Sequence, residues 1–195
     1  MNPLFEEFKQ SVYELANKLP QWSSEDYSRR FHSAMSSLFE EAGEISGLIS
    51  KRRIRKNYWK AVPNTLEDFE IIRQEFISEA SDFLWVLTCS CYVLGHIDID
   101  LIKQFSDAEI EYNNYELDFE QTLYDVFSSL VLTENANLFE DRCIRSCLED
   151  VAYSFGLFLA SLFKEYNISF DELLTYNMNK LEHRYDKDGK RVDGK

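Results

Sequence analysis

The chain has few of the residues that interrupt a helix. Its 195 residues include six glycines and three prolines, and the prolines (Pro3, Pro20 and Pro63) all lie in the first third. Because proline removes a backbone donor and clashes with the preceding turn, its absence from 64–195 favours long helices. Hydrophobic residues make up 45% of the chain and aromatic residues 15%, which excludes a disordered protein. The sequence therefore predicts an all-α fold with a substantial core.

Positive charge is scarce as well. The chain has 21 basic against 35 acidic residues, a formal charge of −14 at pH 7. This balance argues against a protein that binds duplex DNA or an anionic membrane, because nothing would supply broad counterion release. Charges interrupt every apolar run short of a membrane span, and no signal peptide opens the chain. We therefore expect a cytoplasmic protein.

Residues that bind zinc or iron are few. The four cysteines show neither a CxxC pair nor zinc-ribbon spacing, and we interpret them as small buried side chains. They are Cys89, Cys91, Cys143 and Cys147. A di-iron carboxylate bundle needs Glu-x-x-His pairs, and the three histidines supply none. They are His32, His96 and His183.

Two short acidic segments, 38–45 and 77–84, carry the clearest functional signal. Glu41 and Glu44 stand three residues apart, as do Glu79 and Asp82, so each pair projects from one side of a helix. At about 100° per residue, the first pair lies roughly 80° and 140° from the apolar stripe of its helix. The second pair lies roughly 60° and 120° from its own stripe, in the same sense.

Carboxylates at the border of a buried seam repel one another and lose hydration, so they require a compensating cation. We expect the two helices to pack together and the four acids to hold Mg²⁺, with Mn²⁺ as an alternative, because all the ligands are oxygen atoms. The competing interpretation is that these acids are solvated edges of ordinary surface helices.

A basic segment, 51–60, follows the first acid pair. It holds six cations in ten residues, from Lys51 to Lys60, with Tyr58 and Trp59 among them. We interpret it as a loop that binds the outer phosphates of a nucleotide, with an aromatic ring to stack on a base. The alternative is a solvated linker.

The rest of the pattern predicts further helices with defined ends. Asn2-Pro3 begins the first, Ser23 or Ser24 caps the second, Gly95 ends the third, and Ser169 with Glu172 forms a capping box for the last. The expected helices are 3–18, 24–49, 66–94, 98–115, 118–134, 139–166 and 169–183.

An internal repeat relates two parts of the chain. Segments 76–84 and 95–102 align with 147–155 and 166–173 at a constant offset of 71 residues. In the second copy Asp150 replaces Glu79, Tyr153 replaces Asp82, and an upstream alignment puts Val126 and Ser129 in place of Glu41 and Glu44. The repeat predicts a catalytic half, 1–97, that carries the acidic site. Segment 98–195 is then a degenerate half together with a C-terminal substrate-binding helix and tail, and the two halves form one compact pseudo-dimeric domain.

Three segments in order carry a family resemblance. Phe39–Ile45 is similar to a GEAGE segment, Glu79–Trp85 to E-L-x-D-x-L-W, and the ending, with Asn177, Lys180 and Arg184, to N-x-x-K-L followed by R-Y and D-G. Together they resemble the MazG-like nucleoside triphosphate pyrophosphohydrolases, an all-α superfamily that includes dimeric dUTPases and dCTP pyrophosphatases. The chain departs from a minimal member in its longer stretch between the acid pairs, in Val86 where a tyrosine often follows the tryptophan, and in segment 98–166.

The resemblance implies a helical catalytic core with Mg²⁺ on Glu41, Glu44, Glu79 and Asp82. It also implies hydrolysis of an NTP or dNTP to the monophosphate and pyrophosphate. The candidate substrate-binding residues are Asn177, Lys180, Arg184, Trp85, Lys51 and Lys60.

The residues also suit this chemistry on physical grounds. The metal would neutralise the triphosphate and activate a water for in-line attack on the α-phosphorus, with one of the acids, or Glu75, accepting the proton. The alternative function is a non-catalytic nucleotide sensor or interaction protein. The base and sugar of the nucleotide stay open, as does the choice between a monomer and a homo-oligomer.

Overall fold

The computed structural model describes residues 2–58, 66–115, 117–135, 141–186 and 189–192, with side chains for all of these except 52–58, 66–67 and 141–142. Within the described residues the chain forms helices and loops, with one isolated bridge between Tyr185 and Arg191. The helices are α1 (Pro3–Ala16), α2 (Tyr27–Tyr58), α3 (Leu66–Val93), α4 (Leu101–Tyr115), α5 (Phe119–Glu134), α6 (Asp141–Tyr166) and α7 (Phe170–Arg184). The predicted all-α class is confirmed, and the architecture is compatible with a MazG-like helical fold.

Most helix ends follow the predicted signals. The Asn2 side chain accepts hydrogen bonds from the first amides of α1, and Gly95 ends α3 with a φ of 86°, which glycine adopts without strain. Ser169 and Glu172 form the expected capping box of α7. The predicted serine cap of α2 is wrong, because Asp26 Oδ1 accepts from Ser28 N at 2.9 Å and the helix starts at Tyr27.

The basic segment is not a loop where the structure describes it. The backbone of α2 continues without a break through 51–58 and ends at Tyr58. Lysine and arginine are good helix formers, and no glycine or proline interrupts 48–62, so local preference extends the helix. Residues 59–65, including Trp59 and Lys60, lie outside the described residues.

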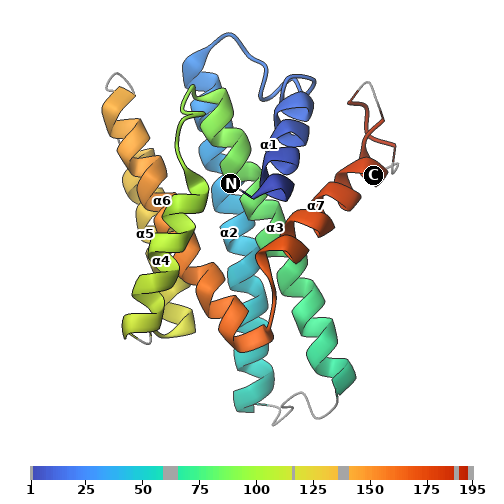
Figure 1. The fold of residues 1–195 in the computed structure, drawn as a ribbon, viewed down its shortest axis with the longest axis vertical. Coiled ribbons are helices and arrows are strands. Elements are labelled where there is room, and N and C mark those ends of the chain that lie inside the picture. The colour runs from blue at the N-terminus through green and yellow to red at the C-terminus, as the bar shows by residue number, and fades with distance from the viewer. Residues whose placement is uncertain (1, 59–65, 116, 136–140, 187–188, 193–195) are drawn as a thin grey trace.

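The long helices pack in pairs (Figure 1). Helix α2 packs against α3, and α5 packs against α6. The two pairs meet through contacts of α2 with α5 and of α3 with α6. Helix α4 packs on α6, α7 packs on α3, and α1 covers part of α3 and α7. The C-terminal helix α7 therefore lies directly beside the helix that carries Glu79 and Asp82.

One apolar core joins the helix pairs. Phe83 of α3 stacks on Phe155 of α6 with ring centroids 4.3 Å apart, and both side chains are fully buried. Phe76 of α3 meets Phe119 of α5 edge to face at 5.7 Å. Residues from all of these helices contribute to the same buried cluster, so the acidic segments of α2 and α3 rest on a rigid support.

The cysteine prediction holds for one pair only. Cys89 and Cys91 are buried, whereas Cys143 and Cys147 are half-buried near the start of α6. Of the described residues, segment Cys143–Tyr166 is long and apolar enough to cross a membrane, but 67% of its most apolar window is buried inside the protein, as in the core helix of a soluble protein.

Candidate functional site

Helices α2 and α3 bring three of the predicted acids together. One ligand oxygen from each of Glu41, Glu79 and Asp82 lies within 4.8 Å of the others. The neighbouring Ala42 and Ala80 are fully buried in the seam between the helices, so the acids stand at its border, as their angles predict. In the described part of the chain this is the one group of His, Cys, Asp or Glu side chains close enough to hold a metal ion.

Glu44 lies at the rim of this acid cluster. Its side chain is exposed, and its carboxyl is close enough to Glu79 to raise the pKa of that carboxyl. It is also close enough to Glu41 to raise the pKa of that carboxyl. Glu44 therefore belongs to the acidic group electrostatically, although it stands outside the set of three that meet within 4.8 Å.

Burial and mutual repulsion make two of the acids hard to ionise. Burial is the main reason that the pKa of Glu41 rises to about 8, and the charges of Asp82, Glu44 and Glu79 add to it. The pKa of Glu79 rises to about 7, first because of burial and then because of Glu44. Without a divalent cation, the cluster therefore retains protons near neutral pH.

Helix α7 supplies two partners for Asp82. The Lys180 ammonium forms an ion pair with Asp82 Oδ2 and also lies 3.4 Å from Ser78 Oγ. Asn177 Nδ2 donates to Asp82 Oδ1 and to the Ser81 backbone oxygen, at 3.2 Å each. The acids of α2 and α3 therefore lie together with Asn177 and Lys180 of α7.

A polar junction fixes the start of α7. Arg73 of α3 donates to the backbone oxygens of Tyr166 and Asn167, at 3.2 Å each, and forms an ion pair with Glu172. Glu172 also accepts from Ser169 N at 2.7 Å, so the helix cap and the ion pair share one carboxylate. This junction sets the register in which α7 presents Asn177 and Lys180 to α3.

Three buried polar atoms, one each on α2, α3 and α7, have no hydrogen-bond partner among the described residues. They are Glu41 Oε2, Asn177 Oδ1 and Trp85 Nε1. Trp85 lies less than one turn after Asp82 on α3, and its ring meets Trp22 edge to face at 6.1 Å. A buried donor or acceptor left unpaired costs about 1–3 kcal/mol. Glu41 and Asn177 both lie at Asp82, so their two unpaired oxygens favour a site that is completed by a ligand.

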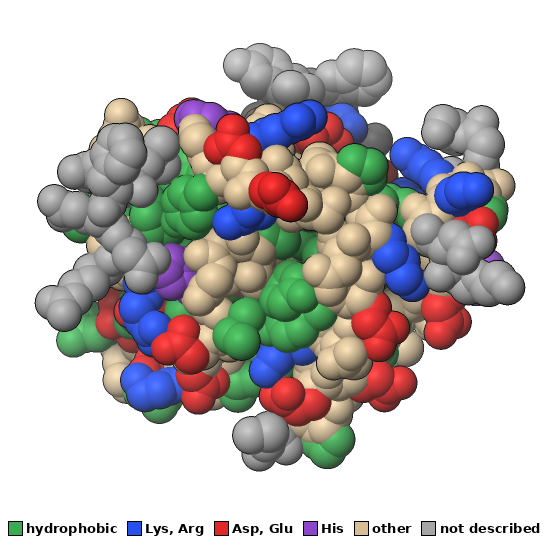
Figure 2. All heavy atoms as spheres, turned by 90° about the horizontal axis from the view of Figure 1, so that it is seen from above, with side chains coloured by type: hydrophobic (Ala, Val, Ile, Leu, Met, Phe, Trp, Pro, Cys, Tyr) green, Lys and Arg blue, Asp and Glu red, His purple; other side chains and the backbone are tan. Residues whose placement is uncertain are grey.

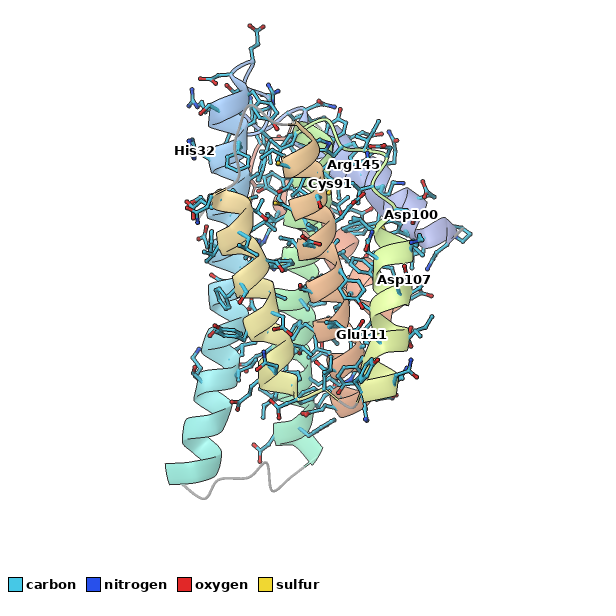
Figure 3. All side chains as sticks on the ribbon, turned by 90° about the vertical axis from the view of Figure 1, so that its left-hand side faces the viewer. His32, Cys91, Asp100, Asp107, Glu111 and Arg145 are labelled. Atoms are coloured by element: carbon cyan, nitrogen blue, oxygen red, sulfur yellow. The ribbon has the colours of Figure 1, made fainter. Side chains whose placement is uncertain are left out.

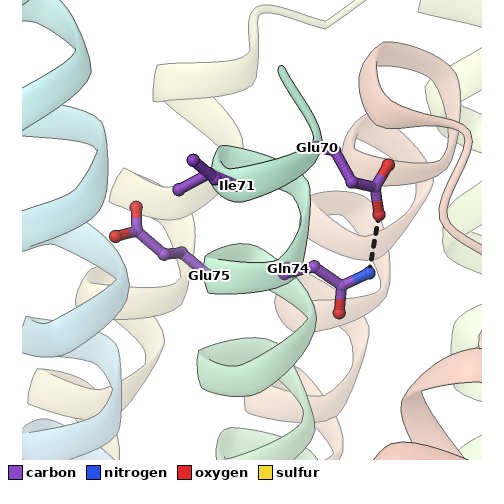
Figure 4. A pocket seen from close by; sticks show the side chains of 4 residues that line it. All are labelled: Glu70, Ile71, Gln74 and Glu75. Carbon is purple, nitrogen blue, oxygen red and sulfur yellow. Dashed lines mark hydrogen bonds between the residues drawn. The ribbon is translucent and has the colours of Figure 1, made fainter. Parts of the chain in front are cut away.

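A shallow hollow of about 440 Å³ lies nearer the start of α3, at Glu70, Ile71, Gln74 and Glu75 (Figure 4). Glu75 and Ile71 project to one side of the helix, and Gln74 donates to Glu70 at 2.7 Å on the other. Glu75 is one helical turn before Glu79 and is exposed. It lies beside the acid cluster and outside it, which keeps it available as a proton acceptor.

The other predicted binding residues lie further out. Lys51 is exposed on α2, seven residues beyond Glu44. Arg184 is half-buried at the end of α7, where its backbone oxygen accepts from Val192 N at 2.8 Å. Lys60 falls outside the described residues. The structure thus brings Asn177 and Lys180 to the acids. Trp85 follows Asp82 on α3 and packs against Trp22, and Lys51 and Arg184 lie at the periphery.

Sequence reasoning missed three residues of the site. Ser78 and Ser81 contact Lys180 and Asn177 from α3, and the Tyr176 ring centroid lies 6.0 Å from the Lys180 nitrogen. The serines do have a sequence signal, because each directly precedes one of the acids in 78–82. The position of Tyr176 depends on the packing of α7 and has no comparable signal.

Comparison with known proteins adds no relative, since no family model, curated protein or solved structure matches this chain.

Proposed function

We propose that this protein is a Mg²⁺-dependent nucleoside triphosphate pyrophosphohydrolase, which cleaves an NTP or dNTP to the monophosphate and pyrophosphate. The observation that carries the proposal is the convergence of Glu41, Glu79 and Asp82 within 4.8 Å, beside a lysine and an asparagine of α7. Its three sequence segments also resemble the MazG-like superfamily, whose members carry out this reaction.

The donors at the site fit a hard divalent cation. All of them are carboxylate oxygens, which suit Mg²⁺ or Mn²⁺, and the group as described contains no His or Cys, which disfavours zinc. Glu41 Oε2 is buried and unpartnered, so an oxygen ligand is already desolvated. Glu41, Glu79 and Asp82 would hold the ion, with Glu44 at the rim. When bound, the ion supplies charge neutralisation for the triphosphate and activation of the attacking water.

The other residues bind and orient the nucleotide. The Lys180 ammonium binds the phosphates, where it stabilises the negative charge of the departing pyrophosphate. Asn177 and Trp85 offer a buried acceptor and a buried donor to the nucleoside. Water forms the new bond to the α-phosphorus, the α–β anhydride bond breaks, and the water proton passes to a carboxylate, either one of the cluster or Glu75.

The second half has lost this chemistry at the matching positions. Tyr153 stands where the repeat expects Asp82, and its hydroxyl donates to Glu111, which follows Asp107 along α4 (Figure 3). Ser129, which replaces Glu44, shares a hydrogen bond of 2.9 Å with Ser154. These contacts are internal to the helices of the second half, which we interpret as a scaffold.

Helix packing supports the proposed duplication. Helix α7 packs on α3, and α4 packs on α6, so each of the two long helices that the repeat relates is covered by one shorter helix. The offset of 71 residues matches Trp85 with Gly156. A Cβ on Gly156 would lie 2.8 Å from Ala108 Cβ and 3.0 Å from Phe105 Cα. Glycine thus allows α4 to pack closely on α6. At the matching position of the first half, Trp85 stands on α3, the helix of the proposed metal site.

The surface argues for a small ligand over a polyanion. Figure 2 shows Lys and Arg side chains interspersed with Asp and Glu on the face that it displays. With a net charge of −14, such a mixed face suits a single nucleotide held by a local lysine better than it suits a polyanion. The remaining alternative is a sensor that binds a nucleotide without cleaving it.

The direct experiment measures Mg²⁺-dependent pyrophosphate release across a panel of ribo- and deoxynucleoside triphosphates, including modified bases. We expect turnover of at least one nucleotide, and we expect Glu79→Gln to abolish it with helix content by circular dichroism unchanged. The matched control is Glu40→Gln, because Glu40 is exposed on α2. Nucleotide binding without turnover in the whole panel would identify a sensor, and an active Glu79→Gln variant would refute the site.

A further inference from the structure

Both carboxylate oxygens of Asp82 are already engaged. Oδ2 pairs with the Lys180 ammonium, and Oδ1 accepts from Asn177 Nδ2 at 3.2 Å. In contrast, Glu41 Oε2 is buried in the same cluster and has no partner among the described residues. Asp82 therefore cannot take up a cation at Oδ2 unless the lysine moves, whereas Glu41 has a free buried oxygen.

The Lys180 ammonium stands where a cation is needed most. Its side chain is 15% exposed and that of Asp82 is 19% exposed, so water screens the pair only partly. Its positive charge also opposes the rise in pKa of both Glu41 and Glu79. One lysine thus partly balances an acidic group that would otherwise repel itself.

Few polar contacts hold the lysine in place. Besides Asp82, the described structure gives its nitrogen a long contact to Ser78 Oγ, at 3.4 Å, and the Tyr176 ring at 6.0 Å. Lysine carries a single point charge on four flexible carbons, so the head can swing away while the stem stays on α7. Asn177 is different, because it is 1% exposed and also bonds the Ser81 backbone oxygen.

We propose that Lys180 is an exchangeable counter-ion: it occupies Asp82 in the empty site, and a divalent cation displaces it, so that the freed ammonium binds the triphosphate. This inference rests on the proposed function and adds to it the order in which the cation and the triphosphate engage Asp82 and Lys180. The ion competes with Lys180 for Asp82, and the nucleotide gives the displaced lysine a new anionic partner. The divalent cation alone should therefore bind weakly, and the cation and the triphosphate should each raise the affinity for the other.

A structural role for the same ion pair predicts the opposite behaviour. If Lys180 mainly fastens α7 to α3, its removal loosens the site and weakens any cation bound there. If it competes with the cation, its removal tightens cation binding, because no ammonium group then neutralises the three carboxylates. The sign of the change in metal affinity separates the two roles.

The test is calorimetric titration of the metal-free full-length protein with Mn²⁺ alone, at constant pH and ionic strength. Lys180→Met should raise the affinity for Mn²⁺ about tenfold, while Lys180→Arg, which keeps a cation, should stay near the parent. Lys9→Met is the matched control, because it removes a lysine paired with Glu6 on α1 and changes the net charge equally.

The outcomes are distinct. Unchanged or weaker Mn²⁺ binding by Lys180→Met would overturn the exchange while leaving the metal site intact. If Lys180→Met does not fold, Lys180→Gln replaces it in the same titration, with the same criterion. If neither the parent protein nor the Lys180 variant binds Mn²⁺ at millimolar concentration, the proposed function is refuted instead.

Discussion

Glutamine at position 41 should stabilise the metal-free protein at alkaline pH. Burial and the neighbouring acids raise the pKa of Glu41 from 4.5 to about 8. In the unfolded chain the carboxyl ionises near 4.5, so the folded state holds the extra proton between these values. The free energy of unfolding therefore falls as pH rises from about 4.5 to about 8, and the full cost of the charge is present above that.

The magnitude follows from the same values. At 1.36 kcal/mol per pKa unit, the rise corresponds to about 5 kcal/mol at full weight. Glu41 is only partly buried, so solvent screening reduces this, and we expect about 2 kcal/mol. For a chain of this length, that difference shifts the melting temperature by roughly 4–8 °C.

The assay is thermal unfolding in a chelator at pH 5 and pH 9. Glu41→Gln should match the parent protein at pH 5 and melt at the higher temperature at pH 9, because glutamine has no charge to bury. Glu40→Gln, the exposed neighbour, should match the parent at both values. A Glu41→Gln variant that is no more stable than the parent at pH 9 would show that Glu41 is not buried among like charges.

Two further predictions concern packing and the junction at α7. Gly156→Ala should destabilise the protein by about 1–3 kcal/mol in urea unfolding, because the new Cβ would lie 2.8 Å from Ala108 Cβ. The control is Gly47→Ala, whose Cβ would have nothing within 4 Å and which should be neutral or stabilising by up to about 1 kcal/mol. Equal effects would contradict the close approach of α4 to α6. Arg73→Ala should lower the free energy of unfolding in urea by about 2 kcal/mol, because Arg73 binds Glu172 and two backbone oxygens. A loss below about 0.5 kcal/mol would show that this junction does not stabilise the fold.

Much of the site could be predicted from local pattern. The i, i+3 spacing of Glu79 and Asp82 fixes their direction on a helix, and their angle to the apolar stripe places them at the seam between α2 and α3. Asn177 and Lys180 come from the resemblance of the chain's ending, and the structure puts both at Asp82. Periodicity says which side of a helix is buried, and this was enough to predict the pairing of the acids.

The wrong prediction at the basic segment came from competition between local signals. The predicted cationic loop at 51–58 is helical, because lysine and arginine favour helix when no breaker intervenes. Glu44 follows Glu41 at the same spacing as Asp82 follows Glu79, and its side chain lies exposed at the rim, so its role as a metal ligand stays a prediction. Spacing gives a direction about the helix axis and does not give the distance to the neighbouring helix.

By itself, the sequence determined the all-α class, the helix caps at Asn2 and Ser169, and the side of each helix that carries acids. These are properties of short segments, set by caps, breakers and periodicity. Only the tertiary structure decided that α7 lies on α3, so that Lys180 reaches Asp82 over 98 residues of sequence. Contacts between distant segments depend on how the whole core packs, and side-chain burial, which raises the pKa of Glu41, exists only once that core has formed.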